Sequence, residues 1–256
     1  MTEKLRSTIS KAAFPVGAIL LILVIWQVVS MLGLVPQFML PSPVSVVRAL
    51  IKDFPLLMSH AAVTMLETLI GLLAGVLIGF GFAVLMDMFT PLYRAFYPLI
   101  VLTQTIPTIA IAPLLVLWFG YEMLPKVILV VLVVFFPITV SLLDGFRSVD
   151  GDTVNLLRSM GCGRVKLFRY VKLPASLGQF FAGLKISVSY AVVGTVVSEW
   201  VGGFKGLGVY MLKVKSGFAY DKMFAVIFLI SALSLLMMWL VSALRRLCMP
   251  WTRKHN

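Results

Sequence analysis

The sequence predicts an all-α membrane protein that crosses the bilayer with six transmembrane helices. Hydrophobic residues make up 61% of the 256 residues and charged residues only 12%, whereas charged residues are about 25% of an ordinary soluble domain. Uncharged stretches long enough to cross a hydrocarbon core of roughly 30 Å recur along the chain. Both observations argue against a water-soluble globular protein.

The individual spans follow from the positions of charged residues and prolines. Five stretches carry no charge, and a sixth is interrupted only by Lys185 and Glu199; in chain order the six are 12–47, 68–86, 95–121, 127–143, 176–201 and 223–244. The first is longer than one span needs, and the prolines in its second half predict a loop at about 35–60. Little sequence remains for a soluble domain, so residues 1–256 are expected to form a single transmembrane domain.

The net charge of +12 is explained by membrane orientation. With six spans both termini lie on one side, and placing them in the cytoplasm puts fourteen lysines and arginines inside and seven outside. This is the usual bias of cytoplasmic loops. No basic stretch is interleaved with aromatic residues on a soluble module, so no nucleic-acid partner is expected.

Two spans contain features that predict packing or transport. Gly71, Gly75 and Gly79 are four residues apart and predict a face for close helix packing. Span 95–121 has three prolines among polar residues, which favours a kinked helix that lines a pore over a buried structural kink. Hydroxyls and amides at membrane depth can bind a hydrated polar solute, and the candidates for this pathway are Thr103, Gln104, Thr105, Ser187, Ser189 and Thr195.

Glu67 is a seventh candidate for the pathway, with an alternative. A carboxylate inside a membrane is costly and usually faces protein or water. If the second span begins near Ala61, Glu67 lies only about 9 Å along the helix axis. It is then either a solvated residue at the helix end or a part of the pathway.

Enzymatic signatures are missing from the sequence. Cys162 and Cys248 are both expected on the reducing cytoplasmic side, and His60 and His255 are the only histidines, so neither a metal site nor a catalytic residue is expected. No G-x-x-x-x-G-K-[ST] run occurs, so the chain is not expected to bind or hydrolyse ATP by the P-loop route. A partner ATPase would then supply the energy; the alternative is an ion-gradient-driven secondary transporter or channel.

The longest predicted cytoplasmic segment, at about 144–175, has a pattern of its own. Asp150 and Asp152 precede "TVNLLRSM", two glycines interrupt it, and "RVKLFRYVKL" then alternates basic and apolar residues before Pro174. Acidic residues first and basic residues later suit a helix dipole. The pattern predicts two short helices joined at glycine and halted by Pro174.

This segment resembles the coupling motif of ATP-binding cassette (ABC) importer permeases, E-A-A-x3-G-x9-I-x-L-P. Gly161, Val171, Leu173 and Pro174 match its spacing, whereas Asn155 stands at the position of its glutamate. "LPSPVSVVRAL", "IAPLLVLWFGYEMLPKVILVVLVVFFP" and "SEWVGGFKGLGVYM" are similar to the permeases of the sulfonate, taurine, nitrate, thiamine-precursor and riboflavin subfamily. The similarity covers most of the chain and leans towards the vitamin precursors.

The resemblance implies a type I ABC importer permease fold in the bacterial plasma (inner) membrane. It also implies a homodimer, cytoplasmic ATPase subunits that hold ATP and Mg²⁺, an extracytoplasmic solute-binding protein, and alternating access. Leu167 and Phe168 would be apolar anchors for the ATPase, surrounded by arginines. The residues expected to couple the chain to the ATPase are Asn155, Gly161, Arg164, Leu167, Phe168, Arg169, Val171, Leu173 and Pro174.

Overall fold

The computed structural model describes residues 2–33, 35–36 and 39–250 of the chain. In this part every regular element is a helix, which confirms the predicted all-α class. The chain divides into two compact units, Met1–Met58 with Met211–Leu229 and Ser59–Tyr210 with Ile230–Asn256. Both chain termini, and with them the predicted cytoplasmic tail that carries His255, lie outside the described residues.

The first unit contains α1 (Thr2–Met31), α2 (Pro43–Lys52) and the parts of α10 (Leu207–Ser216) and α11 (Tyr220–Cys248) that belong to it. Ser42 caps α2 by accepting a hydrogen bond from the Ser45 N–H at 3.2 Å. The loop predicted at 35–60 is therefore wrong for much of its length. Two of its four prolines stand where helices begin and need no amide donor: Pro43 opens α2 and Pro55 lies in the first turn of α3 (Phe54–Met88).

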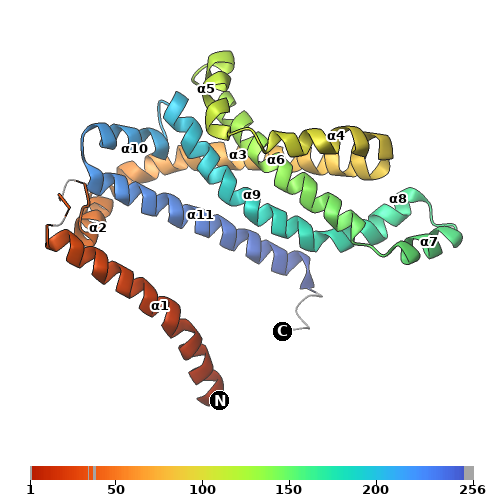
Figure 1. Cartoon of the computed structure of the whole chain (residues 1–256), viewed down its shortest axis with the longest axis horizontal. Helices are drawn as coiled ribbons and strands as arrows, with labels where there is room; N and C mark the ends of the chain where they lie inside the picture. Colours follow the sequence, from red (N-terminus) through yellow and green to blue (C-terminus); the bar gives the residue numbers. More distant parts are fainter. Residues whose placement is uncertain (1, 34, 37–38, 251–256) are drawn as a thin grey trace. The chain divides into compact units, whose positions relative to one another are not determined.

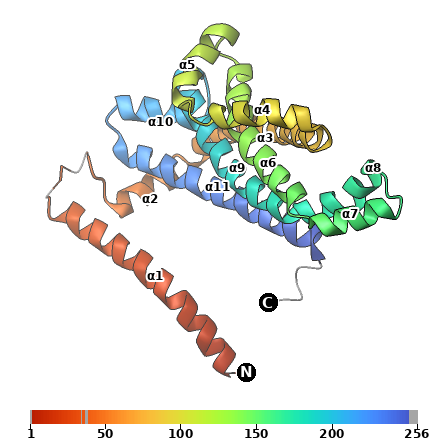
Figure 2. The same ribbon diagram turned by 45° about the vertical axis from the view of Figure 1, so that its right-hand side comes forward.

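The second unit is built on α3, α6 (Met123–Arg147) and α9 (Leu173–Gly202). Helices α6 and α9 run side by side, as both ribbon views show (Figures 1 and 2). Val130, Val134 and Ile138 of α6 are completely buried in the core that these helices share. Apolar contact along nearly the whole length of α6 thus holds the unit together.

Close packing of α3 on α6 confirms the predicted glycine face. A Cβ atom at Gly71 would lie 2.5 Å from Cβ of Val130, and one at Gly75 would lie 2.8 Å from Cγ1 of Val134. Real Cβ atoms do not approach this closely, so only glycine lets the two backbones come together here.

The proline-rich span is broken more sharply than predicted. It forms α4 (Thr90–Thr103) and α5 (Thr108–Phe119), which meet at an angle of 98°. Pro107 precedes the first residue of α5, while Pro98 and Pro113 lie inside helices. The kink predicted for one continuous helix is thus a turn at 104–107, where the backbone leaves the helical path.

The remaining helices of the described chain are α7 (Gly151–Ser159), α8 (Arg164–Leu167) and a π-helix, η1 (Phe168–Lys172). Four helices of the described chain are long and apolar enough to cross a membrane, or five spans if α4 and α5 count as one. They account for five of the six predicted spans. The apolar stretch Val16–Met31 of α1 lies within the predicted first span.

Candidate functional site

Residues 150–174, called the basic segment below, form two helices joined at glycine, as predicted. The Asp150 carboxylate caps α7 by accepting from the Thr153 N–H at 3.3 Å. Gly161 then adopts φ +83°, a left-handed conformation that favours glycine. Gly163 precedes α8, so the chain reverses within a few residues.

The prediction that Pro174 halts the second helix is wrong. Helix runs without interruption from Arg164 to Gly202. The wider π turn of η1 lets the Leu173 N–H donate to the Phe168 carbonyl, five residues back. Because Pro174 follows this turn at the start of α9, the helix continues past it. The basic segment is therefore continuous with a helix of the core.

The residues predicted to couple the chain to a partner differ in exposure. Asn155, Gly161, Arg164, Arg169 and Pro174 are exposed. Phe168, Val171 and Leu173 are half-buried, and Leu167 is only 2% exposed.

The predicted role of Leu167 as an anchor for a partner does not fit this structure. Its side chain is buried within the chain, and the neighbouring Phe168 ring packs edge-on against Phe146 with ring centres 5.1 Å apart. The apolar side chains that the segment leaves exposed are others: Leu156, Met160, Val165 and Tyr170. Basic and apolar residues alternate along this segment, so the sequence does not show which of the apolar side chains are buried.

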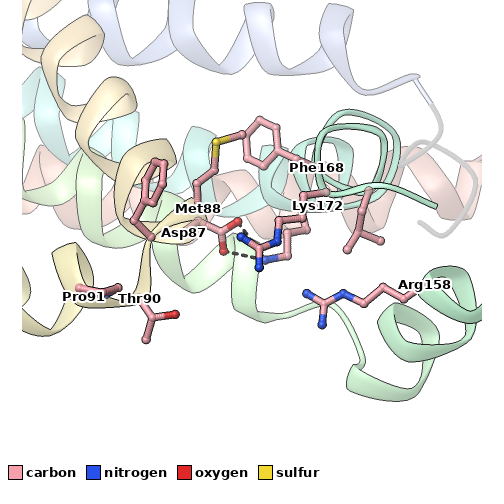
Figure 3. A pocket seen from close by; sticks show the side chains of 10 residues that line it. Asp87, Met88, Thr90, Pro91, Arg158, Phe168 and Lys172 are labelled. Carbon is pink, nitrogen blue, oxygen red and sulfur yellow. Dashed lines mark hydrogen bonds and ion pairs between the residues drawn. The ribbon is translucent and has the colours of Figure 1, made fainter. Parts of the chain in front are cut away.

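A cavity of about 330 Å³ lies beside the basic segment (Figure 3). It is bounded by the end of α3, the start of α4, and residues of α7, α8 and η1. The Lys172 ammonium donates to both carboxylate oxygens of Asp87, at 2.6 and 2.9 Å. Arg158 reaches from α7 towards this ion pair (Figure 3). Asp87 was not predicted, because 85 residues separate it from Lys172.

A second cavity, of about 270 Å³, lies at the break between α4 and α5. Two of the predicted pathway residues, Thr103 and Gln104, line it together with Tyr190 of α9. Thr105 is exposed but does not line it, and its hydroxyl donates to the Leu102 carbonyl at 2.8 Å. The break thus places polar groups and an aromatic ring around one hollow.

The pathway candidates on α9 lie inside the helix packing. Ser187 and Thr195 have no exposed surface. The Thr195 hydroxyl accepts from Thr68 at 2.8 Å and donates to the Ala191 carbonyl at 2.9 Å. Half-buried Ser189 donates to Sδ of Met238. These residues are separate from the cavity at the break, and a solute can reach Ser187 or Thr195 only if the helices move apart.

Glu67 forms an ion pair with Lys126 of α6, with Nζ and Oε1 2.5 Å apart. Glu67 is 3% exposed and Lys126 is 4% exposed, so the pair is shielded from water. This excludes the interpretation of Glu67 as a solvated helix-end residue in this conformation. The sequence indicates that Glu67 needs a partner but does not identify Lys126.

Glu199 organises the connection between α9 and α10. Its carboxylate accepts from the Thr64 hydroxyl at 2.7 Å and from the Gly208 N–H at 2.6 Å. A side chain at Gly206, whose φ is +144°, would collide with this carboxylate. In the motif "SEWVGGFKGLG", the carboxylate of Glu199 is therefore buried and enclosed by the backbone of the glycines that follow it.

His60 contributes to a structural contact in the described part of the chain. His60 Nδ1 accepts from the Gly206 N–H at 3.1 Å, which fixes the same connection. Cys162 and Cys248 are free thiols. No group of three or more His, Cys, Asp or Glu side chains that could hold a metal occurs in the searched part of the chain.

Known proteins resemble this chain over most of its length. Residues 70–248 match the family described as binding-protein-dependent transport system inner membrane component. A probable ABC transporter permease protein of Haemophilus influenzae is 40% identical over 214 residues, 84% of this chain and 87% of that protein. The formylaminopyrimidine transport permease ThiX of Halalkalibacterium halodurans is 36% identical over 247 residues, 96% and 98% of the two chains.

Solved structures share the fold at lower identity. A chain of the MetNI methionine ABC transporter in an inward-facing conformation matches with a TM-score of 0.68 and 19% identity, over 77% of this chain and 98% of that chain. A chain of an amino acid ABC transporter crystallised with histidines matches with a TM-score of 0.62 and 21% identity, over 77% and 94%. At such identities the match concerns the fold alone.

Proposed function

The chain belongs to the binding-protein-dependent family of ABC importer permeases, as its sequence motifs predict, and we propose how it is coupled to ATP and what it carries. In this proposal, ATPase subunits bind the basic segment from the cytoplasm and hydrolyse ATP with Mg²⁺. A binding protein on the outer side delivers a small polar solute. The permease, with both termini in the cytoplasm, moves the solute inward by alternating access.

The observation that carries this proposal is the continuity of the basic segment with α9. Helix without interruption from Arg164 to Gly202 joins an exposed surface to the buried core of α6 and α9. A close-packed core moves as a body and does not deform locally. A push on the exposed end is therefore transmitted along α9 to Tyr190 at the cavity and to Glu199 at the far end of the helix.

The surface that would meet the ATPase is the exposed apolar side of α7 and its turn. Leu156 is 62% exposed and Met160 is 75% exposed, four residues apart and thus on one helix face. Arg164 and Arg169 are exposed nearby. Apolar anchors surrounded by arginines are typical of the centre of a protein interface.

The solute would pass the cavity at the break between α4 and α5, completed by a second copy of the chain. The face around the break is exposed and largely apolar; it includes Leu102, Ile106 and Ile109. Thr103, Gln104 and Thr108 offer polar side chains from the two sides of the break to the cavity. A helix face of this kind suits contact with another copy in the bilayer, with the polar groups facing the solute.

For the solute we propose a thiamine precursor such as a formylaminopyrimidine. The support is the likeness to the formylaminopyrimidine permease, which extends over 96% of this chain. Relatives named for riboflavin, taurine and sulfonates are 28–30% identical. The vitamin precursor is therefore favoured over the sulfonates.

The proposed function is tested by uptake of labelled formylaminopyrimidine into proteoliposomes that contain the permease, its ATPase and its binding protein. Uptake is expected with ATP and not with a non-hydrolysable analogue, and an ionophore that collapses ion gradients should leave it unchanged. Taurine in place of the precursor tests the solute separately. Uptake by the permease alone, driven by an ion gradient, would overturn the assignment to ATP.

The proposed docking surface is tested by the double substitution Leu156→Ser and Met160→Ser. Removing two exposed apolar anchors should weaken binding of the ATPase about tenfold or more. Leu247→Ser is the matched control, since Leu247 is 74% exposed near the end of α11 and is not part of the surface. Co-purification of the ATPase with each variant measures the effect, and equal retention in the two variants would refute the surface.

A further inference from the structure

The cavity in Figure 3 has more positive than negative charge. Three basic residues line it, Arg158, Arg164 and Lys172, against the single carboxylate of Asp87. Asp87 is paired with Lys172. Within the described chain neither arginine forms an ion pair, so two guanidinium groups from two different helices remain available at one hollow.

The backbone at the cavity adds further donors. Helix α4 begins at Thr90 beside the cavity, and no side chain caps it. Pro91 has no N–H and the Tyr93 N–H donates to the Phe89 carbonyl at 3.1 Å, so the amides of Thr90 and Leu92, together with the helix dipole, favour a negative charge there. The Thr90 hydroxyl lies in the same lining. Donors thus converge from α4, α7 and α8.

We propose that this cavity binds a phosphate group, and that the group is the headgroup of an anionic phospholipid. Guanidinium groups match phosphate oxygens with paired hydrogen bonds. A volume of about 330 Å³ is within the usual range for small-molecule sites, roughly 300–1,000 Å³.

The walls of the cavity favour a lipid over free phosphate. Met88, Phe89, Leu167 and Phe168 supply apolar surface, and Phe89 is 52% exposed where the apolar helix α3 gives way to α4. Basic pockets where membrane helices meet the cytoplasm bind lipid headgroups. The location in the cytoplasmic leaflet rests on the proposed function; the phosphate site itself does not.

The test measures binding to the full-length permease without its ATPase. Native mass spectrometry counts phosphatidylglycerol bound to the wild-type protein, to R158Q/R164Q and to K166Q/R169Q. The second double variant is the matched control, since it removes the same two charges from exposed neighbours that do not line the cavity. Affinity is expected to fall about tenfold or more in R158Q/R164Q and less than twofold in the control.

The substitution Asp87→Asn should change the affinity for phosphatidylglycerol in the opposite direction. Neutralising Asp87 frees Lys172 and leaves three unpaired cations, so phosphatidylglycerol should bind roughly three to tenfold more tightly. A role of Asp87 that is merely structural would weaken binding. Tighter binding in this variant and weaker binding in R158Q/R164Q together exclude a general loss of fold.

Inorganic phosphate, added to protein in neutral detergent, shows whether the site binds free phosphate or a lipid headgroup. Thermal stabilisation by phosphate but not by phosphatidylglycerol, lost only in R158Q/R164Q, would keep the phosphate site and overturn the lipid assignment. Equal losses of lipid in both double variants would overturn the site, because they indicate diffuse surface charge. The site is also overturned if neither phosphatidylglycerol nor phosphate binds to the wild-type permease, as expected for a pocket that receives a carboxylate of the partner ATPase.

Discussion

The ion pair of Glu67 and Lys126 shows how costly a single charge is inside this protein. Both side chains are almost completely buried. Each charge has lost its hydration and is stabilised mainly by the other, so the pair contributes little in total, but neither member can be removed alone. The pair therefore specifies how α3 meets α6.

Lys126→Met should lower the free energy of unfolding by roughly 3–5 kcal/mol, because it leaves a buried unpaired carboxylate. The double variant with Glu67→Gln should recover most of this loss. Denaturation of the purified protein in detergent measures both. Lys222→Met is the control. Nζ of Lys222 lies 2.7 Å from Oδ2 of Asp53, but the lysine side chain is 35% exposed, so the free energy of unfolding should fall by only about 0–1 kcal/mol. Equal losses in the two single variants would contradict the argument.

Sequence identifies some of these residues and not others. Glu67 stands out because a carboxylate in an apolar helix is expensive. Lys126 does not, since 59 residues separate it from Glu67 and only the fold brings them together. Leu167 shows the reverse error. Its basic neighbours in the sequence predict an exposed anchor, but its position on the helix places its side chain in the interior.

The contact of α3 with α6 predicts opposite effects for two glycines of the same helix. Gly71→Ala forces a methyl group against Val130 and should destabilise the protein by about 1–3 kcal/mol. Gly81→Ala meets no atom within 4 Å and should stabilise it by about 0.4–1 kcal/mol through the unfolded chain. Thermal unfolding of the two variants decides this, and destabilisation of the same size in both would show that the glycine face is not a packing contact.

The turn between α7 and α8 predicts a second pair of glycine effects, this time on coupling. Gly161→Ala places a side chain at φ +83° and should cost about 1–2 kcal/mol, which distorts the exposed end of the basic segment. Gly163 has φ −68° and open space around it, so Gly163→Ala introduces no comparable backbone strain and should leave uptake unchanged. ATP-driven uptake measures both, and unchanged uptake in Gly161→Ala would show that the shape of this turn does not matter for coupling.

Helices were easier to predict than the points where they change direction. The spans follow from apolar length and the glycine face from a spacing of four. The break at 104–107 and the π turn at 168–172 do not, because a proline inside a membrane helix can kink it, end it or be absorbed by a wider turn. Pro98, Pro107 and Pro174 have three different outcomes in one chain.

The proposed association of two copies through the α4–α5 face predicts a site-specific cross-link. In a C162S/C248S background, Gln104→Cys should form a disulfide-linked dimer in membranes after mild oxidation, since the cavity at the break would lie between copies. Leu77→Cys is the control, because Leu77 is 72% exposed on α3 and would face lipid. Gel electrophoresis without reductant measures both, and equal cross-linking from the two positions would indicate random collision.

The family and the membrane class were predictable for the molecule as a whole. The apolar stretches of membrane-spanning length, the distribution of basic residues and the family motifs together cover most of the chain. The division into two compact units was not, since residues 1–58 join residues 211–229 across most of the sequence. No change of composition marks that boundary. Distant segments that share one unit leave no local signal.

The π turn at Phe168–Lys172 separates the orientation of the exposed basic segment from that of the buried helix α9. Each residue of an α-helix turns the chain by about 100°. Losing the one extra residue of the wider turn would swing Arg164 and Val165 to another side of the axis, while everything after Pro174 kept its phase. Deleting one residue from this turn would therefore redirect the surface proposed to bind the ATPase and leave the buried half of α9 unchanged.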